Sequence, residues 1–298
     1  MIPYNQKPVN TLETEGSVIP VFQIDEGNID EKTVESFGEE WTKFSRFDDE
    51  EIRIAGDQYF DIIPEAYLKD KTVLDVGCGT GRWMRYVADK AKFVDGIDPS
   101  VAVLAAAKLL KDKNNIRISK AGVDNIPFAD ESFDFVFSLG VLHHIPDTAK
   151  AMKDSVKKLK KGGYFLVYLY YSLDNRGMLF KLLFFLSNVL RSFISKLPSG
   201  FKKFICDIIA IVAYMPFVLL TKLMKAIGLK KIVKYIPLSY YADKSFNIIK
   251  NDALDRFGTP LEQRFSKGEI REMMEKAGLS DIVFSEGEPY WHAVGQKL

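Results

Sequence analysis

The 298-residue sequence has few of the residues from which disulfide frameworks and metal sites are built. It contains two cysteines, Cys78 and Cys206, and three histidines, of which His143 and His144 are adjacent. Two cysteines are too few for a disulfide framework, and neither stands at a metal-ligand spacing. The first ten residues lack a basic region followed by an apolar one, so we expect no signal peptide. Together these absences predict a cytoplasmic protein without a metal.

Charge of one sign is scarce in two parts of the chain, although the net charge is only +1. Residues 1–60 contain 14 acidic and five basic residues. Residues 176–235 contain 11 basic residues and one acidic residue, Asp207. This separation of acidic and basic residues indicates what the protein binds and does not indicate its fold.

Glycine is concentrated in one stretch, VLDVGCGTGRW at residues 73–83. An apolar run leads into Gly77, Gly79 and Gly81, and a helical pattern follows, which predicts a strand that turns into a helix facing a ligand. The spacing is not the G-x-G-x-x-G of dinucleotide sites, because Arg82 occupies the third glycine position, and this disfavours a nicotinamide enzyme. Taken alone, the loop is equally typical of a tight turn.

Strands and helices alternate from residue 72, with predicted strands at 72–76, 93–97, 116–120, 133–138 and 164–170. A capped helix at 266–277 and strands at 282–284 and 290–294 close the pattern. We predict an α/β fold with a doubly wound, mostly parallel, seven-stranded Rossmann-like sheet that binds its ligand at the strand C-termini.

The predicted domains are an N-terminal extension and helical lid at 1–66, a cofactor-binding core at 67–172, a helical insertion at 173–265 and the closing helix and strand pair at 266–298. Residues 1–30 show no sustained period and are interpreted as an extended or partly ordered lead-in. Phe37, Trp41 and Phe44 share one helical face, which is typical of a helix docked on the core or of a lid over the ligand.

Four ordered motifs carry a family resemblance. The first is LDVGCGTG at residues 74–81, followed by VDGIDPS at 94–100, NIPFADESFD at 125–134 and LHHIPD at 142–147. In this order and spacing they resemble class I S-adenosylmethionine-dependent methyltransferases, in particular the small-molecule branch typified by ubiquinone/menaquinone methyltransferases. The resemblance implies S-adenosyl-L-methionine as cofactor and S-adenosyl-L-homocysteine as product.

The resemblance also implies which residues contact the cofactor. Asp98 is placed to accept both ribose hydroxyls, and Asp75 to bind the methionine amine or else to stabilise the turn. The family has an aspartate where this chain has Gly122, so the adenine contact falls to Asp124 or to a backbone carbonyl. The full cofactor-binding set is Asp75, Gly77, Cys78, Gly79, Gly81, Asp98, Pro99, Val123, Asp124, Leu139 and His144.

The implied reaction is an in-line displacement of methyl from sulfur to an oxygen or nitrogen atom, for which positioning matters most. We predict His144, His143 and Tyr168 as catalytic residues; the alternative is that they are polar loop residues and core aromatics. The predicted substrate-binding residues are Tyr170, Tyr240, Tyr241, Arg256 and Arg264, although both arginines also have nearby acidic residues with which to pair. The alternative function is a protein that binds S-adenosylmethionine without transferring methyl.

We expect the insertion to determine which substrate the protein binds. Its most apolar stretch, residues 204–220, is shorter than the ~20 residues of a membrane span. Asp207 interrupts this stretch, and a break is predicted at Pro216. The insertion is interpreted either as a helical cap or as a patch that contacts an anionic membrane through residues 176–235, at the inner membrane face.

The partners follow from this interpretation. Because the basic residues of the insertion stand among Phe, Leu and Ile, we do not expect nucleic acid as a partner. The expected acceptor is a small molecule, lipid-linked or glycan-linked. An alternative function is that of a lipid methyltransferase that acts at the membrane surface. The sequence does not indicate an oligomeric state.

Overall fold

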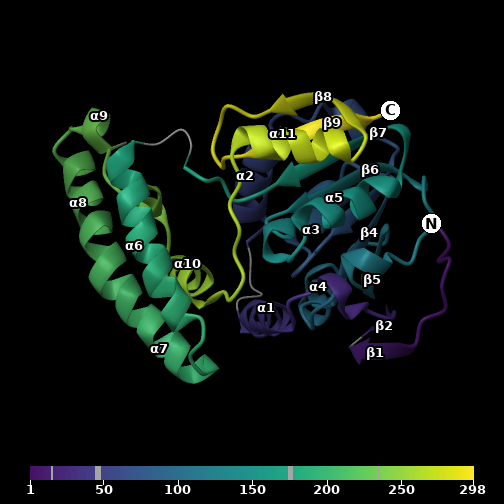
Figure 1. Cartoon of the computed structure of the whole chain (residues 1–298), viewed down its shortest axis with the longest axis horizontal. Helices are drawn as coiled ribbons and strands as arrows, with labels where there is room; N and C mark the ends of the chain where they lie inside the picture. The colour runs from purple at the N-terminus through teal and green to yellow at the C-terminus, as the bar shows by residue number, and fades with distance from the viewer. Residues whose placement is uncertain (15, 44–47, 174–176, 234) are drawn as a thin grey trace. The chain divides into compact units, whose positions relative to one another are not determined.

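The computed structural model describes residues 1–14, 16–43, 48–173, 177–233 and 235–298 of the chain. It divides into two compact units, which we describe separately (Figure 1). The α/β unit comprises Met1–Asn175 and Leu261–Leu298, and the helical unit comprises Arg176–Pro260.

One sheet organises the α/β unit, with the strand order β1-β2-β5-β4-β3-β6-β7-β9-β8. Strands β3 to β7 are mutually parallel where they pair, and β9 is antiparallel to both β7 and β8. The predicted fold class is therefore confirmed, and β3 to β9 are its seven expected strands. The strands are β1 (Asn10–Thr14), β2 (Ser17–Val21), β3 (Thr72–Val76), β4 (Phe93–Asp98), β5 (Ile116–Lys120), β6 (Phe133–Leu139), β7 (Leu159–Tyr168), β8 (Leu279–Phe284) and β9 (His292–Lys297).

The N-terminal segment extends this sheet, contrary to the lead-in that we predicted. Strands β1 and β2 form an antiparallel pair, and β2 joins β5 through the pairing of Val21 with Lys120. Ile19 and Phe22 are buried at 2% and 1% exposure, so the segment contributes to the core. Each strand has only five residues, and Pro20 interrupts the alternation, which explains why no period was visible.

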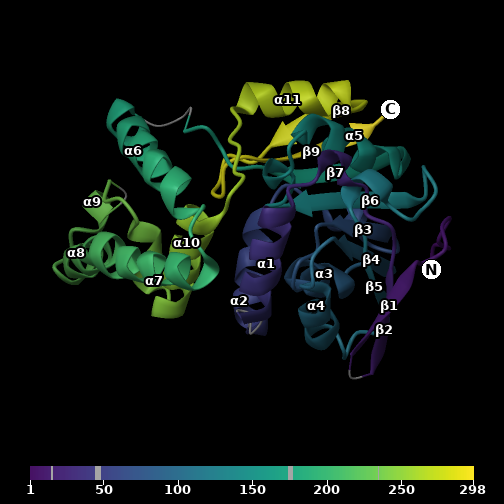
Figure 2. The ribbon, with the colours of Figure 1, turned by 60° about the horizontal axis from the view of Figure 1, so that its bottom comes forward.

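Helices cover both faces of the sheet (Figures 1 and 2). Buried side chains of α3 (Arg82–Ala88) and α4 (Val103–Leu109) form one core with the sheet, and those of α5 (Thr148–Lys157) and α11 (Lys267–Lys276) form the other. Two cores on opposite faces are the arrangement of a doubly wound sheet, and they leave the strand C-termini open for a ligand.

Two N-terminal helices and several short turns complete the α/β unit. Helix α1 spans Glu31–Lys43 and contacts α4, and α2 spans Asp49–Tyr59 and packs on α3. Of the predicted amphipathic face, Phe37 packs on His144, while Phe44 lies outside the described residues. The short turns are η1 (Glu26–Asn28), η2 (Glu65–Tyr67), η3 (Val123–Asn125) and η4 (Leu142–His144).

The helical unit has its own small core, formed by Ile194, Cys206, Ala210, Tyr214, Val218, Ile249, Ala253 and Phe257. Its elements are α6 (Met178–Ile194), α7 (Ser199–Ile209), η5 (Ala210–Tyr214), α8 (Met215–Ala226), α9 (Lys230–Val233), η6 (Ser239–Asp243) and α10 (Phe246–Gly258). The break predicted at Pro216 is wrong, because the π-turn η5 accommodates this proline and the helix continues from Gly200 to Ala226.

Candidate functional site

The glycine loop between β3 and α3 is held by the end of the neighbouring strand β4. The backbone N–H groups of Gly77 and Cys78 donate to the carbonyl of Ile97, at 2.8 and 2.9 Å. Gly77 has a φ of 82°, and a Cβ there would lie 2.4 Å from Cγ1 of Val141. Gly79 has a φ of 51°, and a Cβ there would meet nothing within 4 Å. Gly77 is thus required for packing, whereas Gly79 presents its backbone to open space.

Asp98, at the end of β4, connects that strand to the loop. Its Oδ2 accepts from the backbone N–H of Gly79 at 3.0 Å. Its Oδ1 accepts from the backbone N–H and the hydroxyl of Ser100, at 2.8 and 2.6 Å. The carboxylate therefore fixes the loop while it stands at the ligand edge of the sheet, and its contact with ribose remains a prediction.

Asp75 is a buried carboxylate for which the described residues supply no hydrogen-bond donor. It is fully buried in β3, and neither carboxylate oxygen has a hydrogen-bond partner among the described residues. Burial, and then the charge of Asp98, raise the pKa of Asp75 well above its usual range, and Arg82 opposes the shift. The turn-stabilising contact is not formed, so this carboxylate suits a cationic group supplied by a ligand.

The two adjacent histidines follow β6 and lie in turn η4. Burial, and then the nearby His144 and Arg264, lower the pKa of His143 well below its usual value, so this imidazole is neutral. Neither of its ring nitrogens has a hydrogen-bond partner among the described residues, and its ring stacks on Tyr170 with centroids 3.9 Å apart. His144 Nδ1 lies 2.7 Å from the carbonyl oxygen of Leu261. A neutral imidazole can accept a proton, and the burial that keeps His143 neutral also makes it a weak base.

Tyrosines from the end of β7 and the end of α2 lie beside these histidines. The Tyr168 ring lies 5.1 Å from that of Tyr59 and 6.5 Å from that of His143. Arg264 lies over Tyr170 at 5.1 Å and forms an ion pair with Glu262 at 2.8 Å. The alternative reading of Arg264, pairing within the chain, is therefore observed, while the substrate roles of Tyr170 and Arg264 stay predictions.

The remaining predicted cofactor residues surround the same edge of the sheet. Leu139 is buried at the end of β6, and Pro99 lies between Asp98 and Ser100. Val123 and Asp124 belong to η3, where the Asp124 carboxylate accepts from Nζ of Lys150. Burial raises the pKa of the Cys78 thiol, so it is not a thiolate.

Three predicted substrate residues lie in the helical unit. The Tyr241 hydroxyl donates to Asp252 at 2.5 Å, and Arg256 donates to the Ser187 hydroxyl at 2.9 Å. Tyr240 is 55% exposed. The glycine loop and the histidines belong to the other unit, so the substrate roles of these three residues remain predictions.

Hydrogen bonds between distant segments, which the sequence does not indicate, also support the site. The backbone N–H of Gln263 donates to the carbonyl of His143 at 2.9 Å, and its side-chain amide donates to that of Ile145 at 2.7 Å. Asn28 and Asp147 exchange two hydrogen bonds, at 3.0 and 2.6 Å. These partners stand more than 100 positions apart, so no local pattern could have identified them.

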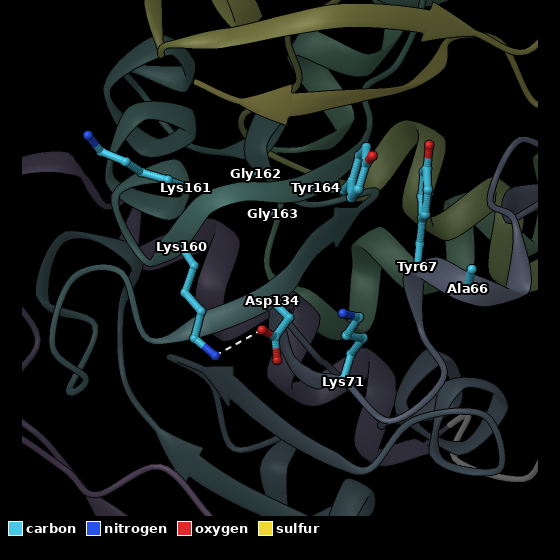
Figure 3. Close-up of a pocket in the computed structure, with 9 residues that line it drawn as sticks. All are labelled: Ala66, Tyr67, Lys71, Asp134, Lys160, Lys161, Gly162, Gly163 and Tyr164. Carbon is cyan, nitrogen blue, oxygen red and sulfur yellow. Dashed lines mark hydrogen bonds and ion pairs between the residues drawn. The ribbon is translucent and has the colours of Figure 1, made fainter.

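A separate pocket of about 200 Å³ lies at the opposite edge of the sheet, where β3, β6 and β7 begin (Figure 3). Tyr67 and Tyr164 stack there, with ring centroids 3.7 Å apart. The pocket is lined by Ala66, Tyr67, Lys71, Asp134, Lys160, Lys161, Gly162, Gly163 and Tyr164. Because ligands of doubly wound sheets bind at strand C-termini, this pocket is not the cofactor site. Within the described ranges, no group of three His, Cys, Asp or Glu residues is arranged to hold a metal.

Comparison with known proteins identifies residues 74–167 as a match to a family model described as "Methyltransferase domain". A tRNA U34 carboxymethyltransferase of Nautilia profundicola is 38% identical over 105 residues, which are 34% of this chain and 35% of the relative. The Campylobacter curvus protein of the same name is 37% identical over 120 residues, 39% of this chain and 40% of the relative. Phosphoethanolamine N-methyltransferase 2 of Caenorhabditis elegans is 40% identical over 104 residues, 34% and 24% of the two chains.

The family match confirms the resemblance to class I S-adenosylmethionine-dependent methyltransferases and the cofactor that it implied. The expectation about partners is wrong. We expected a small-molecule acceptor and no nucleic acid, whereas several relatives are named as enzymes of tRNA. That expectation rested on the composition of the insertion, which lies outside residues 74–167 that the family model matches.

Proposed function

We propose that this chain, whose residues 74–167 form a class I S-adenosylmethionine-dependent methyltransferase domain, transfers a methyl group to an oxygen or nitrogen atom of its acceptor. The observation that carries the proposal is Asp75, a buried carboxylate without a hydrogen-bond partner in the described part of the chain. It lies one residue before the end of β3, after which the glycine loop leaves open space beside Gly79.

The residues present fit this cofactor. Asp75 would hold its cationic amine, Asp98 its ribose hydroxyls, and the glycine loop would lie against its amino-acid part. When bound, the cofactor supplies a methyl group on a positively charged sulfur, which leaves by in-line displacement. The chain's own contribution is to orient the two reactants and to exclude water, because the charge on sulfur disappears during the reaction.

A neutral histidine at the edge of the site supplies the remaining chemistry. If the acceptor atom carries a proton, a base must remove it as the new bond forms. His143 is uncharged through burial, and His144 lies directly beside it, with ring centroids 4.1 Å apart. We propose that one of the two takes this proton.

We take tRNA as the acceptor to test first, since several relatives are named for a reaction on tRNA. These relatives match about a third of this chain, and the family model matches residues 74–167, where the cofactor motifs lie. We place the reaction in the cytoplasm; attachment to a membrane is a separate proposal that depends on the helical unit.

The test is incorporation of tritium from methyl-labelled S-adenosylmethionine into unfractionated tRNA by the purified full chain. We expect the purified chain to incorporate tritium into tRNA. Ribonuclease should release this label, and the Gly79→Ala variant should not incorporate it. Label in another cell fraction, with none in tRNA, would overturn the acceptor and keep the methyl transfer. Cofactor binding without transfer to any fraction would favour the alternative of a binding protein without chemistry.

A further inference from the structure

The helical unit exposes far more apolar surface than the α/β unit. Of the 29 large apolar side chains exposed in the described chain, 22 belong to Arg176–Pro260, which is less than a third of the residues. Phe185, Phe193 and Val212 are 62%, 69% and 67% exposed. The exposed apolar residues of the α/β unit include no phenylalanine. Concentration on this scale marks an interaction surface.

Figure 1 shows α7 and α8, which η5 joins into one long helix. This helix carries apolar side chains on both of its sides. Its buried side contributes Cys206, Ala210, Tyr214 and Val218 to the core of the helical unit. Its other side exposes a second stripe at helical spacing, composed of Phe201, Phe204, Ile208, Ile211, Val212, Leu219 and Leu223. A helix that is apolar all round needs a second apolar environment, which the helical unit itself does not provide for this stripe.

Helix α6 exposes a similar surface through Leu182, Phe185, Leu186, Val189, Leu190 and Phe193. Both α6 and α7 also contact α10, so α10 covers the opposite sides of these helices. We call the exposed apolar residues named above, those of α6 and those of the second stripe of the long helix, the apolar face.

Basic residues border the apolar stretch of the long helix. Residues 204–221 contain no Lys or Arg, whereas Lys202 and Lys203 stand before them and Lys222 and Lys225 after them. Residues 176–235 contain 11 basic residues and only one acidic residue. Apolar side chains with long basic side chains at their border match the boundary between acyl chains and anionic headgroups.

The polar groups of the unit favour a helix that lies in the membrane plane over one that crosses it. By length and composition, the helix Gly200–Ala226 is long and apolar enough to span. However, Asp207 on this helix binds Lys203 and Lys250 at 3.0 and 3.2 Å, and Tyr214 donates to Asp252 of α10 at 2.8 Å. A crossing would bring these charged groups and α10 into hydrocarbon, where charge is costly.

We propose that the apolar face docks the protein on an anionic lipid bilayer, with the long helix lying in the plane of one leaflet. The excess of positive charge is the reason for choosing lipid over a second copy of this chain, which would bring the same charges together. This proposal is independent of the acceptor, because it rests on the helical unit alone.

The experiment is co-sedimentation of the full chain with vesicles of phosphatidylcholine alone and of an equimolar mixture with phosphatidylglycerol. We expect binding about tenfold or more stronger to the anionic vesicles, and weaker at high salt because salt screens the basic residues. Alkaline carbonate should release the bound protein, as it does for proteins that do not span.

The variant Phe204→Ser/Ile208→Ser/Val212→Ser removes exposed side chains and should lose vesicle binding while its circular dichroism stays unchanged. Val283→Ser, an equally exposed apolar position of β8 in the α/β unit, is the matched control and should bind like the wild type. Affinity for S-adenosylmethionine should be unchanged in both, which separates this proposal from the proposed function. Absence of binding to anionic vesicles, equal binding by the triple variant, or resistance to carbonate would each overturn it. A dimer that forms through the apolar face in place of vesicle binding would also overturn it.

Discussion

At the scale of single residues, Asp75 and the pair His143 and His144 hold most of the proposed chemistry. The fold buries the Asp75 carboxylate and supplies no donor for it within the described residues. An uncompensated buried carboxylate costs stability, because its ionised form is poorly solvated. We interpret this cost as preparation for a cationic ligand.

The raised pKa of Asp75 predicts that binding of S-adenosylmethionine releases a proton. The carboxyl is protonated below its raised pKa in the free protein and must ionise to pair with the amine, so affinity should rise with pH through that pKa. Calorimetric titrations in buffers of different ionisation enthalpy measure the proton count. Asp75→Asn should bind more weakly and release no proton from this site; unchanged proton release in this variant would remove Asp75 from the account.

His144→Ala should reduce the turnover number by about 10²-fold or more and leave the cofactor dissociation constant within a few-fold of the wild-type value. The reason is that a base acts on the acceptor and adds little to cofactor binding. Steady-state kinetics with labelled cofactor give the turnover, and calorimetry gives the affinity. His143→Gln serves as the comparison, and wild-type kinetics in both variants would show that neither histidine acts.

At the scale of elements, the glycine loop combines packing and ligand access in three glycines at alternate positions. A Cβ at Gly77 would collide with Val141, whereas a Cβ at Gly79 would enter open space. The two positions therefore predict different consequences for the same substitution.

Gly77→Ala should destabilise the fold, because its Cβ would lie 2.4 Å from Val141 and a left-handed φ adds about 1–2 kcal/mol. Gly79→Ala should cost only about 1–2 kcal/mol of strain, yet lose most of the affinity for S-adenosylmethionine. Urea unfolding and calorimetry measure the two quantities. Equal losses of affinity in two equally stable variants would contradict this division.

The elements that sequence predicts well are those whose signals are local. One motif, residues 74–81, contains the end of β3 and the glycine loop, and a second motif, residues 94–100, contains Asp98 at the end of β4. The order of these motifs along the chain therefore identifies the site. Strands β1 and β2 have too few residues to show a hydrophobic period. The helix continues through Pro216 because of the π-turn η5, which no residue pattern predicts. The hydrogen bonds of Gln263 and Asn28 join distant segments, so they emerge only in the fold.

At the scale of the whole molecule, the cofactor and the partner are encoded in different places. The family match ends at residue 167, before the helical unit begins. The motifs therefore predicted the donor correctly, while the expectation about nucleic acid, argued from the insertion, was wrong. The apolar and basic character of the helical unit is independent of the acceptor that we propose.

The central claim is that S-adenosylmethionine binds at the glycine loop of the α/β unit. Hydrogen–deuterium exchange of the full chain, with and without the cofactor, tests it most directly because it locates the protected amides. The account predicts protection of residues 76–81 and of 98–100, with the pocket of Figure 3 unchanged. Unprotected amides at the glycine loop under saturating cofactor, or protection confined to residues 66–71 and 160–164, would contradict it.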